Sequence, residues 1–199
     1  MTREMLFALA LGYLLGSIPF GLVLTRLTGK GDIREIGSGN IGATNVLRTG
    51  SKWLAALTLV LDCLKATAAI VLAQLLFGQF TGLDAATGAM IGHLYPVWLG
   101  FRGGKGVATL LGVLIALLWP AALVYAAVWI FLLATLRISS LAGMTAAVTA
   151  PVVAFALHSS YVPMLLGFAV LVLWKHRDNI RRLKKGTEPR IGSKTSSTA

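Results

Sequence analysis

The sequence predicts an all-α membrane protein, a polytopic bundle of about seven transmembrane helices. Hydrophobic residues make up 56% of the 199 residues and charged residues only 13%, whereas soluble domains carry about 25% charged residues. The apolar residues form long runs separated by short polar segments, the pattern of membrane-spanning helices. The net charge is +11, and most Lys and Arg residues lie in a few of the polar segments. An ordinary soluble domain is therefore excluded.

Apolar runs in the first half of the chain predict transmembrane helices at residues 5–24, 53–77 and 83–101. Each is long enough to cross a hydrocarbon core of about 30 Å. A polar segment, residues 25–52, follows the first run, and a compact basic loop, residues 102–106, follows the third. Because two crossings separate these polar segments, both are expected on the same side of the membrane.

The next apolar run, residues 107–136, would measure about 45 Å as a single helix. Trp119 and Pro120 lie near its middle, and proline disfavours a continuing helix. The run is therefore either one long tilted helix or two short ones. Two further apolar runs, residues 138–157 and 161–174, predict the last two transmembrane helices.

The charges decide between one crossing and two. The C-terminal segment holds eight Lys and Arg residues, and such segments stay on the cytoplasmic side. Only two crossings within residues 107–136 place it on the same side as the two earlier basic segments. The expected arrangement has the N-terminus outside and the C-terminus in the cytoplasm, although residues 107–118 would form a helix of only about 18 Å.

One integral membrane domain is expected over residues 1–190, followed by a Ser-, Thr- and Lys-rich cytoplasmic tail, residues 191–199, that is expected to be disordered. The single cysteine, Cys63, allows no intrachain disulfide and no cysteine metal cluster. The positive charge could attract nucleic acid, anionic lipid or an anionic substrate. In a membrane protein it first reflects topology, so an anionic substrate needs separate evidence.

Residues 32–48 form the first of three polar patches expected on the cytoplasmic face. Its three glycines, Gly37, Gly39 and Gly42, permit backbone angles that aim successive N–H groups at one anion. A helix beginning at residues 40–44 would place the side chains of Thr44 and Arg48 on one face. The other polar residues suited to phosphate are Ser38, Asn40 and Asn45.

The glycines of this patch also match the Gly-x-Gly-x-x-Gly pattern of dinucleotide-binding folds. That pattern requires a preceding strand, and a membrane helix precedes it here, so a dinucleotide fold is excluded. The remaining alternatives are a phosphate-binding loop and a flexible turn between helices. The density of Gly, Ser, Asn, Thr and Arg favours phosphate binding.

The second patch, residues 92–109, contains Gly103, Gly104 and Lys105 in an arrangement similar to a phosphate cradle. It is not a P-loop, because no Ser or Thr follows Lys105. The alternative is a tight cytoplasmic turn whose positive charges set topology, and the residues alone leave both open.

The third patch, residues 175–190, places His176 and Asn179 on one face if the last helix continues. By itself its basic character favours a juxtamembrane tail that binds anionic lipid.

Three ionisable residues lie well inside predicted spans, away from the span ends. Asp62 and Lys65 are spaced to form an ion pair on one helix face, and a structural pair is favoured over direct chemistry because unpaired charges there would be costly. His93 is either a functional residue or a partner in hydrogen bonding between helices.

The sequence lacks several kinds of catalytic machinery. It has no His-x-x-x-x-Asp motif, no Gly-x-Ser-x-Gly nucleophile elbow and no carboxylate cluster able to hold two metals. A site built from phosphate-binding groups would act by positioning and charge stabilisation, which suits a substrate that is already activated. The alternatives are a transporter of phosphorylated metabolites, which would need a polar site at the bilayer midplane, and a structural lipid-binding protein.

The three patches resemble the three cytoplasmic motifs of the bacterial acyl-phosphate:glycerol-3-phosphate acyltransferase family. Residues 38–48 are similar to its SGN-x-GATN-x-x-R motif, residues 92–109 to its GH-x-x-P…F-x-GGKGVAT motif, and residues 176–188 to its HR-x-NI-x-RL-x-x-G-x-E motif. The resemblance covers nearly the whole chain and includes the Gly-Ser-Ile-Pro of residues 16–19.

The resemblance implies that a fatty acyl phosphate donates its acyl group to the sn-1 hydroxyl of glycerol 3-phosphate, giving 1-acyl-glycerol 3-phosphate and inorganic phosphate. It implies neither acyl-CoA nor acyl carrier protein as direct donor, no cofactor or metal, and no nucleic acid. The partners are the two substrates and membrane lipid, and the oligomeric state stays open. The implied location is the bacterial cytoplasmic (inner) membrane, with the active site facing the cytoplasm.

The same resemblance suggests roles for particular residues. Arg48, Lys105, His176 and Asn179 are the expected catalytic residues. The expected phosphate-binding residues are Ser38, Gly39, Asn40, Thr44, Asn45, Arg48, Gly103, Gly104 and Lys105. Which patch holds which substrate is open, as is the proton acceptor, which is either the departing phosphate or His176.

Overall fold

The computed structural model describes residues 1–192, which contain helices and connecting segments and no strand. The α-helices are α1 (Arg3–Gly16), α2 (Phe20–Leu27), α3 (Ala43–Val46), α4 (Lys52–Phe77), α5 (Gly82–Leu94), α6 (Val107–Leu117), α7 (Trp119–Leu136), α8 (Ser139–Ala156), α9 (Val162–Lys175) and α10 (Arg177–Lys184). Short 3-10 turns are η1 (Ile33–Glu35), η2 (Leu47–Thr49), η3 (Gln79–Thr81) and η4 (Val97–Leu99). The predicted all-α class is confirmed.

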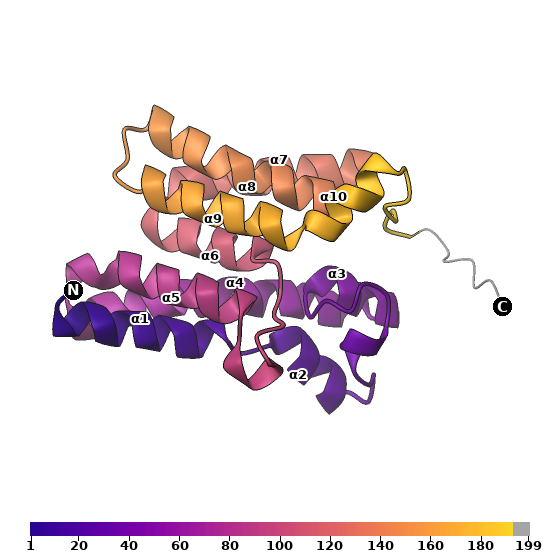
Figure 1. Cartoon of the computed structure of the whole chain (residues 1–199), viewed down its shortest axis with the longest axis horizontal. Coiled ribbons are helices and arrows are strands. Elements are labelled where there is room, and N and C mark those ends of the chain that lie inside the picture. Colours follow the sequence, from indigo (N-terminus) through magenta and orange to yellow (C-terminus); the bar gives the residue numbers. More distant parts are fainter. Residues whose placement is uncertain (193–199) are drawn as a thin grey trace.

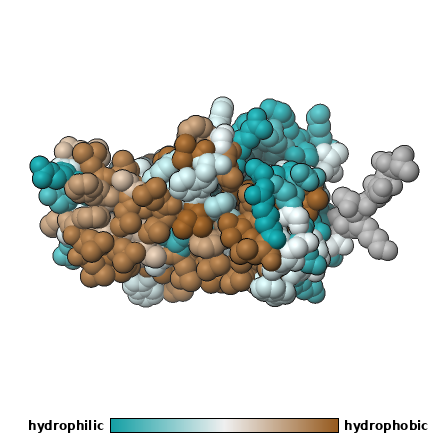
Figure 2. Space-filling model, turned by 90° about the horizontal axis from the view of Figure 1, so that it is seen from below, coloured by the Kyte–Doolittle hydropathy of each residue, from teal (hydrophilic) through white to brown (hydrophobic). Residues whose placement is uncertain are grey.

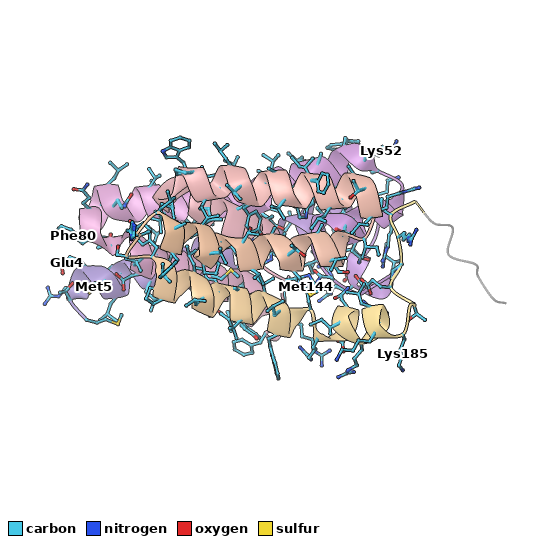
Figure 3. All side chains as sticks on the ribbon, turned by 90° about the horizontal axis from the view of Figure 1, so that it is seen from above. Glu4, Met5, Lys52, Phe80, Met144 and Lys185 are labelled. Carbon is cyan, nitrogen blue, oxygen red and sulfur yellow. The ribbon has the colours of Figure 1, made fainter. Side chains whose placement is uncertain are left out.

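The long helices pack side by side along one direction, with the N-terminus at one end and α2, α3 and α10 at the other (Figure 1). We call the latter the polar end, because most hydrophilic residues gather there while hydrophobic residues cover the body (Figure 2). Glu4 and Phe80 lie at the first end, and Lys52 and Lys185 at the polar end (Figure 3).

Four stretches within residues 1–192 are long and apolar enough to cross a membrane: Arg3–Leu27, Lys52–Phe77, Trp119–Leu136 and Ser139–Ala156. The helices α6 and α9 are apolar but shorter.

The first predicted helix, residues 5–24, is interrupted. Helix α1 ends at Gly16 and α2 begins at Phe20, because Pro19 has no N–H and disfavours helical angles at the residue before it. The carbonyl of Ile18 accepts a hydrogen bond from Lys65 Nζ at 2.8 Å. The stretch Arg3–Leu27 is long and apolar enough to cross a membrane, so the predicted span is present, but Pro19 divides it into two helices.

The long run at residues 107–136 is two helices. Helix α6 ends at Leu117, α7 begins at Trp119, and Pro120 lies in the first turn of α7. The hydroxyl of Tyr125 donates to the carbonyl of Val107 at 2.9 Å, so α7 folds back along α6. The alternative of one long tilted helix is thereby overturned.

The third predicted helix, residues 83–101, is shorter than expected. Helix α5 stops at Leu94, since Pro96 cannot continue it. Residues 95–106 form a loop that includes η4 and runs to the start of α6. This loop carries most of the second polar patch.

Part of the predicted tail is held against the bundle. The N–H of Ile191 donates to the carbonyl of Arg137 at 2.7 Å. Residues 193–199, the rest of the tail for which disorder was expected, lie outside the described residues.

Helices α1 and α5 pack closely over several turns. Gly12 and Gly16 of α1 face Ala85 and Ala89 of α5, and a Cβ at either glycine would overlap a backbone carbonyl of its partner helix. In the same way, Gly88 and Gly92 of α5 meet the backbone of α1. Two Gly-x-x-x-Gly segments thus pack backbone against backbone, the close approach that replaces hydrophobic driving force in membranes.

Gly88→Ala is expected to destabilise the protein by about 1–3 kcal/mol, because its new methyl group must displace the carbonyl of Leu9. Gly167→Ala on α9 is the matched control, since nothing lies within 4 Å of its Cβ position. Thermal unfolding in detergent should show a lower Tm for Gly88→Ala and an unchanged or higher Tm for Gly167→Ala. Equal Tm values would contradict the close packing.

Candidate active site

Residues from all three polar patches line one cleft at the polar end. Its volume is about 460 Å³. The lining comprises Ser38, Gly39 and Asn40 from the first patch, Tyr95, Phe101, Arg102, Gly103 and Lys105 from the second, and Trp174, Lys175, Arg177 and Asp178 around the third. A wider and more open cleft beside Lys52 and Trp53 lies away from these groups, so the smaller one is the candidate site.

Asn45 organises the loop of the first patch. Its side chain is buried and donates to the carbonyls of Ile33 and Ile36 at 2.6 and 3.2 Å. Its Oδ1 accepts from the N–H of Ser38 at 3.2 Å and from Arg48 Nη1 at 3.3 Å. Because both ends of the amide are engaged, Asn45 shapes the patch and holds Ser38 and Arg48 near each other.

Gly37 and Gly39 of this loop are each required for a structural reason. Gly37 has φ +56°, and a Cβ there would overlap the guanidinium of Arg48. Gly39 also has a positive φ, +65°, and lines the cleft beside Asn40. Both positions favour glycine, since other residues rarely adopt such angles.

The helix predicted near residues 40–44 is present but very short. Helix α3 covers only Ala43–Val46, and Arg48 lies in the turn η2. Thr44 and Arg48 are therefore not on one face of a continuous α-helix, contrary to the expectation. Asn40 instead stabilises the entry to α3 by accepting from the N–H of Gly42 at 3.0 Å.

The glycines of the second patch direct their N–H groups into the fold. Gly103 donates to the carbonyl of Leu94 at 3.2 Å and Gly104 to that of His93 at 2.9 Å. These two donors are consumed at the end of α5, so they do not form the expected cradle of free N–H groups. The polar side chain that this segment offers to the cleft is that of Lys105, together with Arg102.

Lys105 connects the second patch with the third. Its Nζ donates to Asn179 Oδ1 at 2.5 Å, and Asn179 Nδ2 donates to Glu188 Oε1 at 2.6 Å. Glu188 also accepts from Ser140 at 2.6 Å and from Arg182 at 2.7 Å. Because Lys105 can only donate and the Glu188 carboxylate can only accept, these two contacts determine which end of the Asn179 amide points to each of them.

Three members of this network were not among the predicted site residues. Glu188 had a signal, since it is one of only seven acidic residues and lies in the third motif. Arg182 also had a signal, since it is a fixed position of the third motif, but it was not assigned to the site. Ser140 begins α8, far away in the sequence, and had no local signal.

His176 lies between α9 and α10, and its side chain is buried. Its Nδ1 is 2.8 Å from the carbonyl of Val172, which assigns the ring proton to Nδ1 and leaves Nε2 as an acceptor. Burial and the positive charge of Lys105 lower the pKa of His176 to about 4. The imidazole is therefore neutral at pH 7 and a weak base.

The charges of the network are also shifted. Burial lowers the pKa of Lys105 to about 8, although Glu188 opposes this effect. Burial acts to raise the pKa of Glu188, but hydrogen bonds from Ser140, Asn179 and Arg182 outweigh it and hold the pKa below its usual value. Near pH 7 the site therefore presents a protonated Lys105 beside an ionised Glu188.

The predicted ion pair inside the bundle is present. Lys65 Nζ lies 2.7 Å from Asp62 Oδ1, and both side chains are almost completely buried. The Nδ1 of His93 lies 2.9 Å from the same ammonium, so His93 takes part in hydrogen bonding between α4 and α5. Over residues 1–192, no group of three or more His, Cys, Asp or Glu is placed to hold a metal ion.

A family model described as glycerol-3-phosphate acyltransferase matches residues 6–186. Two curated proteins with that name are similar over nearly their whole length. The protein of Mesorhizobium japonicum is 56% identical, over 98% of this chain and 100% of its own. That of Nitrobacter winogradskyi is 55% identical, over 95% of this chain and 97% of its own.

The fold is similar to two crystal structures of PlsY (YgiH), described as an integral membrane glycerol 3-phosphate acyltransferase. The glycerol 3-phosphate form has a TM-score of 0.88 and 40% identity, and covers 94% of this chain and 96% of that one. The lysophosphatidic acid form has a TM-score of 0.86 and 39% identity, with coverage of 94% and 95%.

Proposed function

The chain belongs to the glycerol-3-phosphate acyltransferase family and acylates glycerol 3-phosphate to lysophosphatidic acid, and we propose that the acyl donor is a fatty acyl phosphate. The observation that carries the proposal is the convergence of the three patches on one cleft, where Lys105 of the second contacts Asn179 of the third. Both proposed substrates carry a phosphate, and the cleft gathers Lys and Arg side chains from separate segments.

The proposed reaction needs little acid–base machinery. The C1 hydroxyl oxygen of glycerol 3-phosphate attacks the acyl carbonyl, the new ester C–O bond forms, and the anhydride C–O bond to phosphate breaks. The hydroxyl proton passes to the departing phosphate, which leaves as inorganic phosphate. Because an acyl phosphate is already activated, positioning and charge stabilisation supply the catalysis.

The charged side chains have separate proposed tasks. Arg48, held by Asn45 beside Ser38, binds one phosphate with Ser38, Gly39 and Asn40, while Thr44 on α3 supports that loop. Lys105 binds the second phosphate and offsets the negative charge that develops as the anhydride breaks.

His176 and Asn179 complete the site in this proposal. Asn179 holds Lys105 in position, and His176 Nε2 orients the attacking hydroxyl. Gly103 and Gly104 contribute by placing Lys105, because their own N–H groups are used within the fold.

The site is proposed to face the cytoplasm from the inner membrane of a bacterium. The segments that join α4 to α5 and α8 to α9, residues 78–81 and 157–161, contain no Lys or Arg. The basic segments are at the polar end, which the positive-inside rule assigns to the cytoplasm. The N-terminus, at the other end (Figure 1), is then outside.

The donor is tested with purified protein, glycerol 3-phosphate and palmitoyl phosphate, following lysophosphatidate and inorganic phosphate together. We expect both products in equal amounts, and none with palmitoyl-CoA or palmitoyl-acyl carrier protein. In sealed vesicles, external glycerol 3-phosphate should be used by inverted membranes and not by right-side-out ones. Turnover of palmitoyl-CoA at a similar rate would refute the proposed donor, and the opposite vesicle preference would refute the orientation.

The charge of Lys105 predicts a pH dependence. The pKa of its side chain is about 8, so the ammonium that binds phosphate is present below that pH and is lost above it. We expect kcat/KM for glycerol 3-phosphate to fall by up to about tenfold per pH unit above pH 8. Lys105→Arg should be less active but flat to pH 9.5, because a guanidinium stays charged. If kcat/KM fell in the same way above pH 8 in both proteins, the fall would have to come from a group other than Lys105.

His176→Gln tests whether a protein base is used. Glutamine keeps a polar end near Nε2 but has no basicity. A side chain with a pKa of about 4 is a poor base, so we expect kcat to stay within about tenfold of the wild-type value, whereas loss of a general base costs about 10²–10⁴-fold. A fall of that larger size, with an unchanged Tm, would establish His176 as the base.

A further inference from the structure

The transfer reaction gives no role to three buried polar side chains, those of Asp62 and Lys65 on α4 and of His93 on α5. Their exposed fractions are 4%, 2% and 4%. Ionisable groups inside a membrane bundle are costly unless they are paired, and they commonly mark function. Of the three, His93 contacts the loop that carries Lys105, at Gly104.

The ammonium of Lys65 has its hydrogen-bonding capacity filled. It contacts Asp62 Oδ1 at 2.7 Å, the carbonyl of Ile18 at 2.8 Å and His93 Nδ1 at 2.9 Å, and an ammonium has three donors. Since Nδ1 accepts from Lys65, the imidazole carries its proton on Nε2. These contacts fix the orientation of the ring, with its Nε2 edge turned away from Lys65.

That Nε2 edge lies against the backbone of Gly104. A Cβ added at Gly104 would overlap Nε2 of His93. The main chain of His93 holds the same residue, since its carbonyl accepts from the N–H of Gly104 at 2.9 Å. His93 therefore supports Gly104 both through its ring and through its carbonyl, and Lys105 is the next residue.

We propose that Asp62, Lys65 and His93 form a positioning triad for acyl transfer. Asp62 balances the charge of Lys65, and Lys65 orients the imidazole of His93. The imidazole fixes the position of the Gly104 backbone, and this determines where the Lys105 ammonium lies in the cleft. This inference rests on the proposed function, because it takes Lys105 as a substrate-binding group. If the ion pair were purely structural, its removal would lower kcat/KM only as far as it also lowered the stability of the fold.

The contact between the ring of His93 and Gly104 is tested by making residue 93 smaller and residue 104 larger. His93→Asn keeps an acceptor for Lys65 but removes the ring edge, and Gly104→Ala adds a methyl group at that point. Each single variant should lower kcat/KM for glycerol 3-phosphate about tenfold or more. The double variant should be about fivefold or more better than Gly104→Ala, because the methyl group enters the vacated space. A double variant whose loss is the product of the two single losses would refute the contact.

The charged part of the triad is tested by replacing the pair with apolar residues of similar size. Lys65→Met should lower both Tm and kcat/KM, since it leaves Asp62 unpaired. Asp62→Leu with Lys65→Met should recover most of the Tm lost in Lys65→Met but not all of it, because no charge is left unpaired while the carbonyl of Ile18 still lacks its donor; kcat/KM should stay about tenfold low because His93 Nδ1 has also lost its donor. Wild-type kcat/KM in this double variant would refute the positioning role.

Thr67→Val is the matched control for these measurements. Thr67 lies on the same helix, and its hydroxyl donates to the carbonyl of Gly112 on α6 at 2.9 Å, remote from Gly104. We expect near wild-type kcat/KM, and a loss as large as in the triad variants would refute a specific role for the triad. Wild-type protein is assayed beside every variant with palmitoyl phosphate: no turnover there would refute the proposed donor, whereas wild-type turnover with undiminished variants would refute the triad alone.

Discussion

The rest of this architecture depends on one constraint: backbone N–H and C=O groups inside a bilayer have no water to hydrogen-bond, so the protein must supply their partners. The ammonium of Lys65 is one such partner. The interruption at Pro19 leaves carbonyls in the segment between α1 and α2 without partners in a helix. Lys65 donates to one of them, that of Ile18, and Trp98 Nε1 donates to another, that of Ser17, at 2.8 Å. A buried ammonium then requires Asp62, and its third proton reaches His93. The interrupted helix, the ion pair and the loop after α5 are thus parts of one hydrogen-bonded arrangement.

These contacts are possible because α1 and α5 approach so closely. Glycine and alanine line the crossing, and the backbones meet without intervening side chains. At the polar end of the same pair, the hydroxyl of Tyr13 donates to the carbonyl of Tyr95 at 3.0 Å and accepts from the N–H of Val97 at 3.1 Å. Small residues in the body of the bundle therefore determine where the loop that carries Lys105 leaves it.

Much of the fold could be predicted from the sequence, since helices in a membrane follow from apolar runs and charge. The runs at residues 53–77, 138–157 and 161–174 became α4, α8 and α9 with ends shifted by a residue or two. Prolines caused the differences: Pro19 and Pro96 ended helices within apolar stretches that hydropathy alone treats as continuous. The paired Gly-x-x-x-Gly segments of α1 and α5 were also visible in the sequence, but only the structure shows that they face each other.

The sequence could predict which segments form the site, but not which of their hydrogen-bonding groups remain available to a substrate. The motifs indicated that the three patches belong together, and residues of all three line the cleft. Which donors remain available depends on tertiary contacts: the amide of Asn45 and the N–H groups of Gly103 and Gly104 are engaged within the protein. Ser140 reaches Glu188 from a distant helix, a contact that no local pattern encodes.

The lengths of the helices also determine where along the bundle the loop between α5 and α6 lies. Helix α4 has 26 residues, whereas α5 has 13 and α6 only 11, about 39, 20 and 16 Å. The loop between the two short helices therefore begins short of the end of α4 that adjoins α3 (Figure 1). In the proposed orientation, an acyl phosphate would enter sideways from the inner leaflet and lysophosphatidic acid would leave by the same lateral route, so only glycerol 3-phosphate and the released phosphate would have to cross into the aqueous phase.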